Sequence, residues 1–318
     1  MESYSVLGMD IGGTNSVFGI VDARGQVLSR GAIKTASYPR VEDFVQAVCD
    51  NLTPMIEAVG GIDRIKGFGI GAPNANYYTG NIEMAPNLPW KDAVIPLAKL
   101  FSDRLGIPVV LTNDAKAAAI GEMTYGAARG MKNFIMITLG TGVGSGIVVN
   151  GQVVYGHDGF AGELGHTTVQ PDGRLCGCGR KGCLETYCSA TGVARTAREM
   201  LSASAAESLL RSLSPDELTS KDVYDAARQG DPVALEIFRQ TGDILGRALA
   251  NFIAFSSPEA IVFFGGLTKA GDLLLDPIRK SLEENVMPIY KGKTKLLISS
   301  MPDADAAVLG ASALAWEP

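Results

Sequence analysis

The stretch VLGMDIGGTNSVFGIVDARGQVLSR, residues 6–30, decides the fold. An apolar run is followed by a loop of glycine and threonine, a second apolar run and a turn, which is typical of a hairpin built around a glycine loop. The same order recurs in FIMITLGTGVGSGIVVNGQVVYG, residues 134–156. A repeated unit that opens each half of the chain predicts two related domains facing each other across a cleft. Because short repeats are weak signals, a chance likeness between two glycine-rich hairpins is the alternative.

The remaining sequence alternates strand-like and helix-like stretches, which predicts an α/β architecture. A helix is expected to begin at Asp114, where an alanine-rich run follows Thr112 and Asn113, either of which could cap it. The other expected elements are helices over 41–59, 95–105, 184–202, 232–255, 273–286 and 304–316, and strands over 66–74, 107–114 and 260–268.

Composition excludes several classes of protein. The chain has 318 residues, 46% of them apolar, which is enough for two globular domains. No apolar run approaches the length of a membrane span, and the start lacks the features of a secretory leader, so we expect a cytoplasmic protein. Five cysteines do not resemble a secreted disulfide framework. A net charge of −6 without a basic run argues against nucleic acid as a partner.

The two glycine loops, residues 8–15 and 140–146, are candidates for binding phosphate. Successive glycines let backbone N–H groups converge on an anion, and Thr14 and Thr141 add hydroxyl donors. Neither loop matches the Walker A or the dinucleotide-binding pattern, and either could be only a tight hairpin. Two such loops are better explained by a polyphosphate held from both sides, with Asp10 directed at its magnesium ion.

Asp114 is the candidate general base. At the start of a helix, the helix dipole should keep its carboxylate ionised at neutral pH, with a pKa well below neutral. Such a carboxylate can orient an attacking hydroxyl and accept its proton late in phosphoryl transfer. The alternative is that Asn113 and Asp114 serve only as helix caps.

The segment CGCGRKGCLE, residues 176–185, supplies three closely spaced thiols. Cys176, Cys178 and Cys183, together with His166 in the segment 161–166, make the number and type of ligands for tetrahedral Zn²⁺. All four positions would be filled by protein, so the predicted zinc is structural. Cys49 and Cys188 fall in expected helices and are interpreted as core or surface residues.

The motifs DIGGTN, TND at 112–114, LGTGVGSG, AGELGH and CGCGRKGCLE, in this order, resemble the ROK family of repressors and sugar kinases. This resemblance runs from residue 6 to about residue 315. It implies an ATP-dependent hexose kinase of carbohydrate metabolism and glycolysis, with two ribonuclease-H-like lobes of the actin, hexokinase and Hsp70-like ATPase superfamily around a central cleft. Residues 1–115 plus 303–318 would form the small lobe, and residues 116–302 the larger lobe with the zinc site. The family also implies a homodimer or homotetramer.

The resemblance implies roles for individual residues. ATP would lie between the two hairpin loops. Phosphates and Mg²⁺ would be held by Asp10, Gly12, Gly13, Thr14, Gly140, Thr141 and Gly142, and adenosine would be bordered by Gly265 and Gly266. The sugar hydroxyls would be held by Asn113, Asp114, Glu163, His166 and Glu185, with Asp114 as the base.

This placement gives the expected zinc ion a positioning role. One imidazole nitrogen of His166 can bind the metal while the other faces the sugar, and the bond to Cys183 restrains nearby Glu185. Ionised acceptors at 114, 163 and 185 suit a neutral polyhydroxyl substrate. Asn74 stands where sugar kinases often have glycine, and it can adopt the same left-handed backbone, although what this turn contacts on the sugar is left open.

Three alternatives to a glucose kinase are considered. The segment NLPW, residues 87–90, is similar to glucokinase-type members and favours glucose, but fructokinase, mannokinase and N-acetylhexosamine kinase are alternatives. A sugar-responsive repressor would carry a helix-turn-helix ahead of the first lobe, and we expect no room for one in the nine residues before Asp10. A non-catalytic sugar sensor is the third alternative.

Overall fold

The computed structural model describes residues 4–91, 93–302 and 304–316. The chain divides into two compact units. One unit holds the residues up to 131, residues 146–162 and those from 299 on, and the other holds residues 132–145 and 163–298. The lobe boundaries expected after residues 115 and 302 stay a prediction, and residues 1–3, 92, 303, 317 and 318 of that expectation lie outside the described residues.

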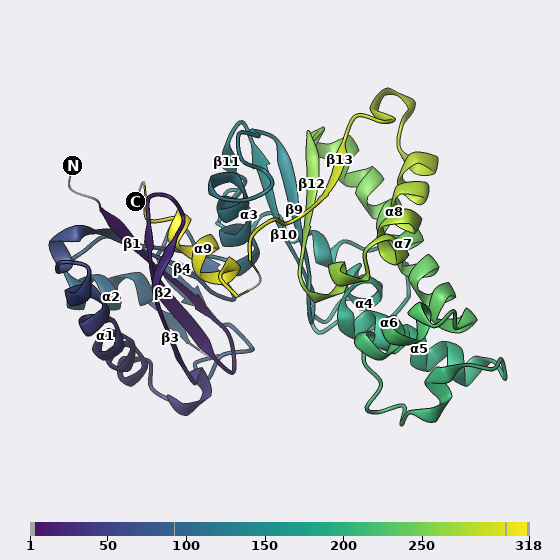
Figure 1. The fold of residues 1–318 in the computed structure, drawn as a ribbon, viewed down its shortest axis with the longest axis horizontal. Helices are drawn as coiled ribbons and strands as arrows, with labels where there is room; N and C mark the ends of the chain where they lie inside the picture. The colour runs from purple at the N-terminus through teal and green to yellow at the C-terminus, as the bar shows by residue number, and fades with distance from the viewer. Residues whose placement is uncertain (1–3, 92, 303, 317–318) are drawn as a thin grey trace. The chain divides into compact units, whose positions relative to one another are not determined.

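A five-stranded sheet with the order β3-β2-β1-β4-β8 belongs to the first unit (Figure 1). The first three strands form antiparallel hairpins, while β1, β4 and β8 run parallel. The strands are β1 (Ser5–Ile11), β2 (Ser16–Asp22), β3 (Val27–Ile33), β4 (Ile65–Gly71) and β8 (Val109–Thr112). A small sheet beside it consists of β5 (Ala75–Asn76), β6 (Asn81–Glu83) and β7 (Val94–Ile95).

The second five-stranded sheet has the order β11-β10-β9-β12-β13, and β9, β12 and β13 run parallel. Its strands are β9 (Phe134–Leu139), β10 (Val143–Val149), β11 (Gln152–Val153), β12 (Ala260–Phe264) and β13 (Lys295–Ile298). In both sheets a hairpin unit comes first in the chain and two parallel strands are added on one side of it. This shared order supports the repeated unit that residues 6–30 and 134–156 predict.

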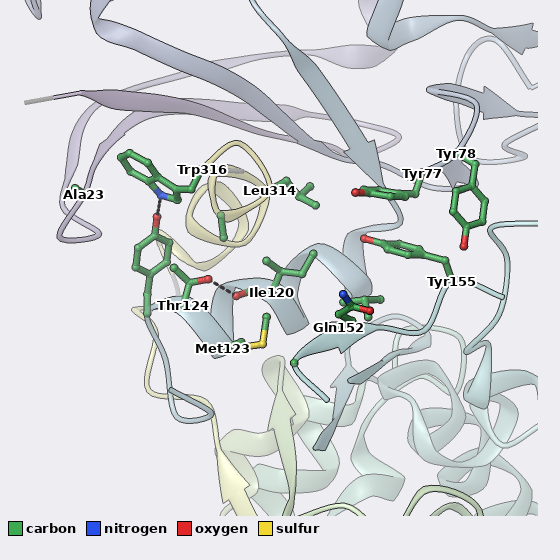
Figure 2. A pocket seen from close by; sticks show the side chains of 14 residues that line it. Ala23, Tyr77, Tyr78, Ile120, Met123, Thr124, Gln152, Tyr155, Leu314 and Trp316 are labelled. Carbon is green, nitrogen blue, oxygen red and sulfur yellow. Dashed lines mark hydrogen bonds between the residues drawn. The ribbon is translucent and has the colours of Figure 1, made fainter. Parts of the chain in front are cut away.

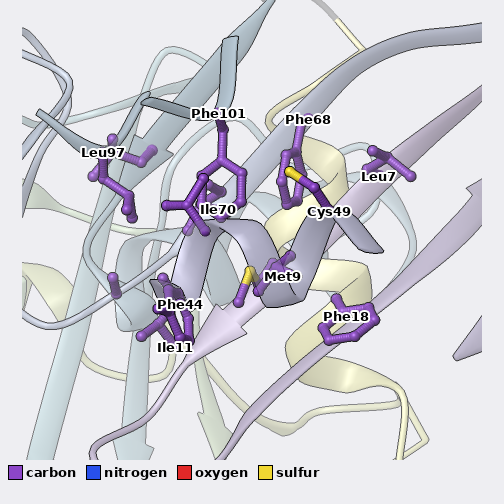
Figure 3. Close-up of a cluster of buried hydrophobic side chains, with 14 of the residues drawn as sticks. Leu7, Met9, Ile11, Phe18, Phe44, Cys49, Phe68, Ile70, Leu97 and Phe101 are labelled. Atoms are coloured by element: carbon purple, nitrogen blue, oxygen red, sulfur yellow. The ribbon is translucent and has the colours of Figure 1, made fainter. Parts of the chain in front are cut away.

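The core of the first unit lies on one face of β1. Since neighbouring residues of a strand point to opposite faces, Leu7, Met9 and Ile11 share a face. All three are buried, and they pack in one cluster with side chains of α1 (Val41–Ala58) and α2 (Leu97–Leu105) (Figure 3). Cys49 of α1 belongs to this cluster, so it is a core residue.

Helix α9 (Ala306–Ala313) packs on the other face of the same sheet. Its backbone comes so close that a Cβ atom added at Gly69 of β4 would lie 1.9 Å from the carbonyl oxygen of Ala311. A similar addition at Gly8 of β1 would lie 2.3 Å from the carbonyl oxygen of Val308. Helices therefore cover both faces, which explains why neighbouring residues of β1 are buried alike and do not alternate between buried and exposed.

The other helices are α3 (Asp114–Thr124), α4 (Glu185–Cys188), α5 (Ala190–Ala203), α6 (Ser220–Arg228), α7 (Pro232–Ser256) and α8 (Asp272–Asn285). The helix expected over 184–202 is in fact two, because Ser189 takes an extended conformation and its side chain caps α5. Sequence analysis missed α6, although Thr219 and Asp222 form a capping box at its start. Among the described residues, no helix is long and apolar enough to cross a membrane.

Candidate active site and metal centre

Two carboxylates meet at the carboxyl end of the first sheet. Asp10 of β1 is paired with Gly71 of β4, and Gly71 is paired with Thr112 of β8. Asp114 follows two residues after Thr112. A Cβ atom added at Gly71 would lie 3.4 Å from Asp10 Oδ1 and 3.5 Å from the Cα atom of Asp114. The parallel register therefore brings together the two acidic residues that sequence analysis assigned to magnesium binding and to catalysis.

Asn113 is the residue that caps α3. Its Oδ1 accepts hydrogen bonds from the N–H groups of Ala115 at 3.0 Å and Lys116 at 3.4 Å. Asp114 is the first residue of the helix, and its Oδ1 accepts from the N–H of Ala115 at 2.8 Å. The capping role considered for Asn113 is thus present. Because the cap occupies Oδ1, the amide Nδ2 of Asn113 is the group that could face a substrate.

Burial acts on both carboxylates. It raises the pKa of Asp10 to about 7, with a smaller contribution from the negative charge of Asp114. Burial also raises the pKa of Asp114, and the hydrogen bonds from the Ala115 N–H and the Asn113 side chain only partly oppose this. Sequence analysis placed the pKa of Asp114 well below neutral because of the helix dipole, and it did not foresee that burial raises this pKa above the ordinary aspartate value. The Asp114 side chain is surrounded by protein and still reachable by solvent, as a base must be.

The first glycine loop joins β1 and β2. The N–H of Gly12 donates to the carbonyl of Asn15 at 3.0 Å, and Thr14 is exposed. A Cβ atom added at Gly13 would lie 2.4 Å from the carbonyl oxygen of Asn87, so the loop packs directly against the NLPW segment. Trp90 of that segment is buried, and its Nε1 donates to the carbonyl of Tyr38 at 3.0 Å. Trp90 is therefore a core residue.

The second glycine loop, Gly140 to Gly142, joins β9 and β10 in the second unit. Three N–H groups in and after this loop bond within the protein: Gly140 to the Gly142 carbonyl at 3.1 Å, Val143 to Glu185 Oε2 at 3.0 Å, and Gly144 to Thr138 Oγ1 at 3.1 Å. They are not available to a phosphate in this conformation.

The turn that carries Gly265 and Gly266 lies beside the second glycine loop. Strand β12 pairs with β9 so that Phe264 is opposite Thr138. A Cβ atom added at Gly265 would lie 2.6 Å from the carbonyl oxygen of Leu139. Gly265 and Gly266, expected to border adenosine, and the phosphate candidates Gly140 to Gly142 therefore share the carboxyl end of two neighbouring parallel strands, which is where open α/β sheets bind ligands.

The candidate metal centre consists of His166, Cys176, Cys178 and Cys183. Their ligand atoms all lie within 4.8 Å of one another. His166 Nδ1 is 3.6 Å from Cys176 Sγ, and Cys178 Sγ is 3.7 Å from Cys183 Sγ. Zinc at about 2.3 Å from sulfur and about 2.0–2.1 Å from nitrogen places tetrahedral ligands about 3.5–3.8 Å apart, so these spacings fit zinc. Burial raises the pKa of Cys176 to about 12, and metal binding would release its proton.

Glu185 and His166, two of the residues expected to bind the sugar, both contact Cys176 of this centre. Glu185 Oε1 lies 3.6 Å from Cys176 Sγ. A Cβ atom added at Gly142 would lie 2.2 Å from Glu185 Oε2, so a larger residue there would displace the Glu185 carboxylate from this position. Nδ1 of His166 faces the Cys176 thiol, so Nδ1 is the ring nitrogen that would bind the metal and Nε2 is the one that could contact a substrate. Glu163 is exposed and precedes the short helix Leu164–His166. Cys188 lies outside the centre, where its Sγ contacts the carbonyl of Thr241 at 3.6 Å.

Sequence analysis missed Lys116, a buried lysine two residues beyond Asp114. Its side chain is only 1% exposed, its Nζ donates to the carbonyl of Gly159 at 3.0 Å, and it lies 5.8 Å from the ring centre of Tyr155. Tyr155 stacks on Tyr77 with ring centres 4.1 Å apart (Figure 2). The only feature of the sequence that could have indicated this buried lysine is its place among alanines at the start of the helix, residues 114–119.

A hollow of about 770 Å³ in the first unit also escaped sequence analysis. Figure 2 shows Tyr77, Tyr78 and Tyr155 at one side of it and Trp316 at the other. No residue predicted to act in catalysis or binding is among those that line it, so it is distinct from the carboxylate pair and the metal centre.

Comparison with known proteins defines the class and then the family. Solved ROK sugar kinases with the two-lobed actin- and hexokinase-like ATPase fold match nearly the whole chain. A ROK family glucokinase from Streptomyces griseus, solved with glucose and AMPPNP, is 37% identical with a TM-score of 0.80, and the match covers 99% of this chain and 100% of that one. The ROK family model matches residues 6–317. The chain therefore belongs to the ROK family.

Curated relatives agree with this membership. A glucokinase from Streptomyces coelicolor is 38% identical over 98% of this chain and 98% of its own length. A glucokinase from Thermotoga maritima is 35% identical over 100% of this chain and 99% of its own length. The family resemblance seen in the sequence motifs is confirmed.

Proposed function

We propose that this chain is an ATP-dependent hexose kinase that phosphorylates glucose at its 6-hydroxyl. The observation that carries the proposal is the solvent-accessible carboxylate of Asp114 beside Asp10, with the pKa of both raised by burial. A carboxylate whose pKa moves toward neutral is a better proton acceptor than an ordinary aspartate. The similarity to glucokinases along the whole chain supports glucose as the hexose.

Asp114 would act on the sugar hydroxyl itself. Its carboxylate would accept the hydroxyl proton while the oxygen attacks the γ-phosphorus of ATP, and the bond from that phosphorus to the bridging oxygen of ADP would break. Asn113 would donate from Nδ2 to a sugar oxygen, since its Oδ1 caps α3. Glu163, Glu185 and the Nε2 atom of His166 would hold the remaining sugar hydroxyls.

Asp10 would hold Mg²⁺, which supplies charge neutralisation for the phosphates when it is bound. Phosphate and nucleotide contacts would come from Gly12, Gly13, Thr14, Gly140, Thr141, Gly142, Gly265 and Gly266. The N–H groups of Gly12 and Gly140 would first have to leave their hydrogen bonds to the carbonyls of Asn15 and Gly142. The four-ligand centre would hold structural Zn²⁺, which supplies rigidity to His166. A cytoplasmic location and a homodimer or homotetramer stay predictions, and light scattering of the purified protein tests the assembly.

A panel of hexoses tests the function directly. ADP release is measured with ATP, Mg²⁺ and glucose, fructose, mannose, N-acetylglucosamine or N-acetylmannosamine, and kcat/KM is compared. The proposal expects the highest value for glucose. A higher value for another sugar would replace glucose as the substrate, and sugar binding without any ADP release would make the chain a sugar-binding regulator.

A further inference from the structure

Arg174 lies in the segment between His166 and Cys176, and its side chain is only 9% exposed. Its guanidinium donates hydrogen bonds to one residue of α4 and two residues of α5. Nη1 donates to the carbonyl of Thr186 at 2.6 Å, Nη2 donates to Thr196 Oγ1 at 2.9 Å, and Nε donates to Glu199 Oε2 at 3.1 Å. One side chain thus ties the metal-binding segment to both α4 and α5.

The main chain of Arg174 is held as firmly as its side chain. Its N–H donates to the hydroxyl of Tyr187 at 3.0 Å, and its carbonyl accepts from the N–H of Gly182 at 2.8 Å. The guanidinium lies 4.4 Å from the ring centre of Tyr187, a favourable cation–π distance. Arg174 therefore connects the chain segment just before Cys176 with Gly182, the residue just before Cys183.

These contacts end next to the residues expected to act on the sugar. Thr186, whose carbonyl accepts from Arg174, directly follows Glu185 in α4. Glu185 in turn contacts Cys176, which lies two residues after Arg174. We propose that Arg174 is a positioning residue that holds Glu185 and the Cys176 side of the metal centre in place, through protein contacts that do not require the metal ion.

Arginine suits this role for a chemical reason. Its planar group offers several N–H donors in fixed directions, whereas lysine offers one compact ammonium group that cannot reach α4 and α5 together. Burial acts to raise the pKa of the Glu199 carboxyl, but the hydrogen bonds and positive charges of Arg174 and Arg195 together hold it below its usual value. Arg174→Lys therefore keeps the positive charge and removes the set of N–H donors in fixed directions.

The test measures zinc affinity and sugar kinetics in the full-length protein. Arg174→Gln and the milder Arg174→Lys are titrated with a chromophoric zinc chelator, and the KM values for glucose and for ATP are measured. We expect zinc affinity to fall about 10-fold or more, as is usual when a group that orients metal ligands is lost. The KM for glucose should rise several-fold while the KM for ATP changes little. Arg239→Gln, which breaks an exposed pair with Glu236 on α7, is the control and should change neither.

The outcomes separate this inference from the kinase proposal on which its sugar-binding half rests. A loss of thermal stability without a change in zinc affinity or in the KM for glucose would make Arg174 a purely structural residue and overturn the inference. If the wild-type protein phosphorylates no hexose, the proposed function fails, while the zinc titration still decides whether Arg174 positions the metal centre. If Arg174→Gln does not fold, Arg174→Lys provides the measurement.

Discussion

Asp10→Asn should stabilise the nucleotide-free protein, and increasingly so as the pH rises. Asp10 has a pKa of about 7 in the folded chain, against 3.8 for an ordinary aspartate. Between these values the unfolded chain is ionised while the folded chain keeps the proton, so folding takes up a proton and stability falls with rising pH. Above the folded pKa the whole penalty is present. Asparagine has nearly the same shape and carries no charge, so it removes the penalty.

The size of the effect follows from the shift. One pKa unit corresponds to about 1.4 kcal/mol, so ionised Asp10 destabilises the fold by at most about 4 kcal/mol at pH 8 and about 1.5 kcal/mol at pH 5. The free energy gained by Asp10→Asn should therefore grow by about 2.5 kcal/mol between these two pH values. A carboxylate that destabilises its own fold is the stability cost expected if Asp10 has the proposed role in binding Mg²⁺.

Urea denaturation of the wild type and the variant at pH 5 and pH 8 measures this difference. Asp103→Asn on α2, which removes an exposed carboxylate paired with Lys99, is the control and should change stability by less than about 1 kcal/mol at either pH. If Asp10→Asn is destabilising at pH 8, or if its effect is the same at both pH values, the assignment of a raised pKa to the Asp10 carboxyl is refuted.

Three other substitutions or profiles test separate parts of the account. Cys178→Ser should lose zinc and raise the KM for glucose together, as metal analysis and steady-state kinetics would show; metal loss with an unchanged KM would mean that His166 and Glu185 do not depend on the ion. The acid limb of kcat/KM against pH should lie above the ordinary aspartate range, since only the ionised form of Asp114 accepts a proton and burial raises its pKa; a limb near pH 4, roughly the ordinary value, would contradict this. Lys116→Met should lower the free energy of unfolding by about 1–3 kcal/mol, because the Gly159 carbonyl loses this donor, whereas Lys99→Met on the surface should cost less than about 1 kcal/mol; equal effects would argue against a specific role.

The sequence predicted what local pattern controls. The repeated hairpins predicted two related domains, and the structure has two five-stranded sheets with the same strand order. This was predictable because alternating apolar strands and glycine loops are visible within short segments of sequence. Asn74 adopts the left-handed backbone expected of it, with φ of 50°, and its side chain donates to the carbonyls of Glu83 and Met84. The four candidate metal ligands also come together, since three of them lie within eight residues.

Properties that depend on tertiary surroundings could not be predicted in this way. The pKa of Asp114 follows from protein packed around it, which its position at a helix start does not reveal. Arg174 and Lys116 act through main-chain carbonyls of distant segments, and a carbonyl acceptor leaves no trace in the sequence. The break at Ser189 was readable in principle, because a serine ahead of Gly192 is an ordinary helix cap.

Asp114→Asn tests the central claim most directly, with kcat for glucose phosphorylation and the Kd for glucose by calorimetry measured on the same preparation. Asparagine keeps a hydrogen-bonding shape and cannot accept the proton, so kcat should fall by about 10²–10⁴-fold while the Kd changes only a few-fold. A variant that turns over at nearly the wild-type rate would contradict the account.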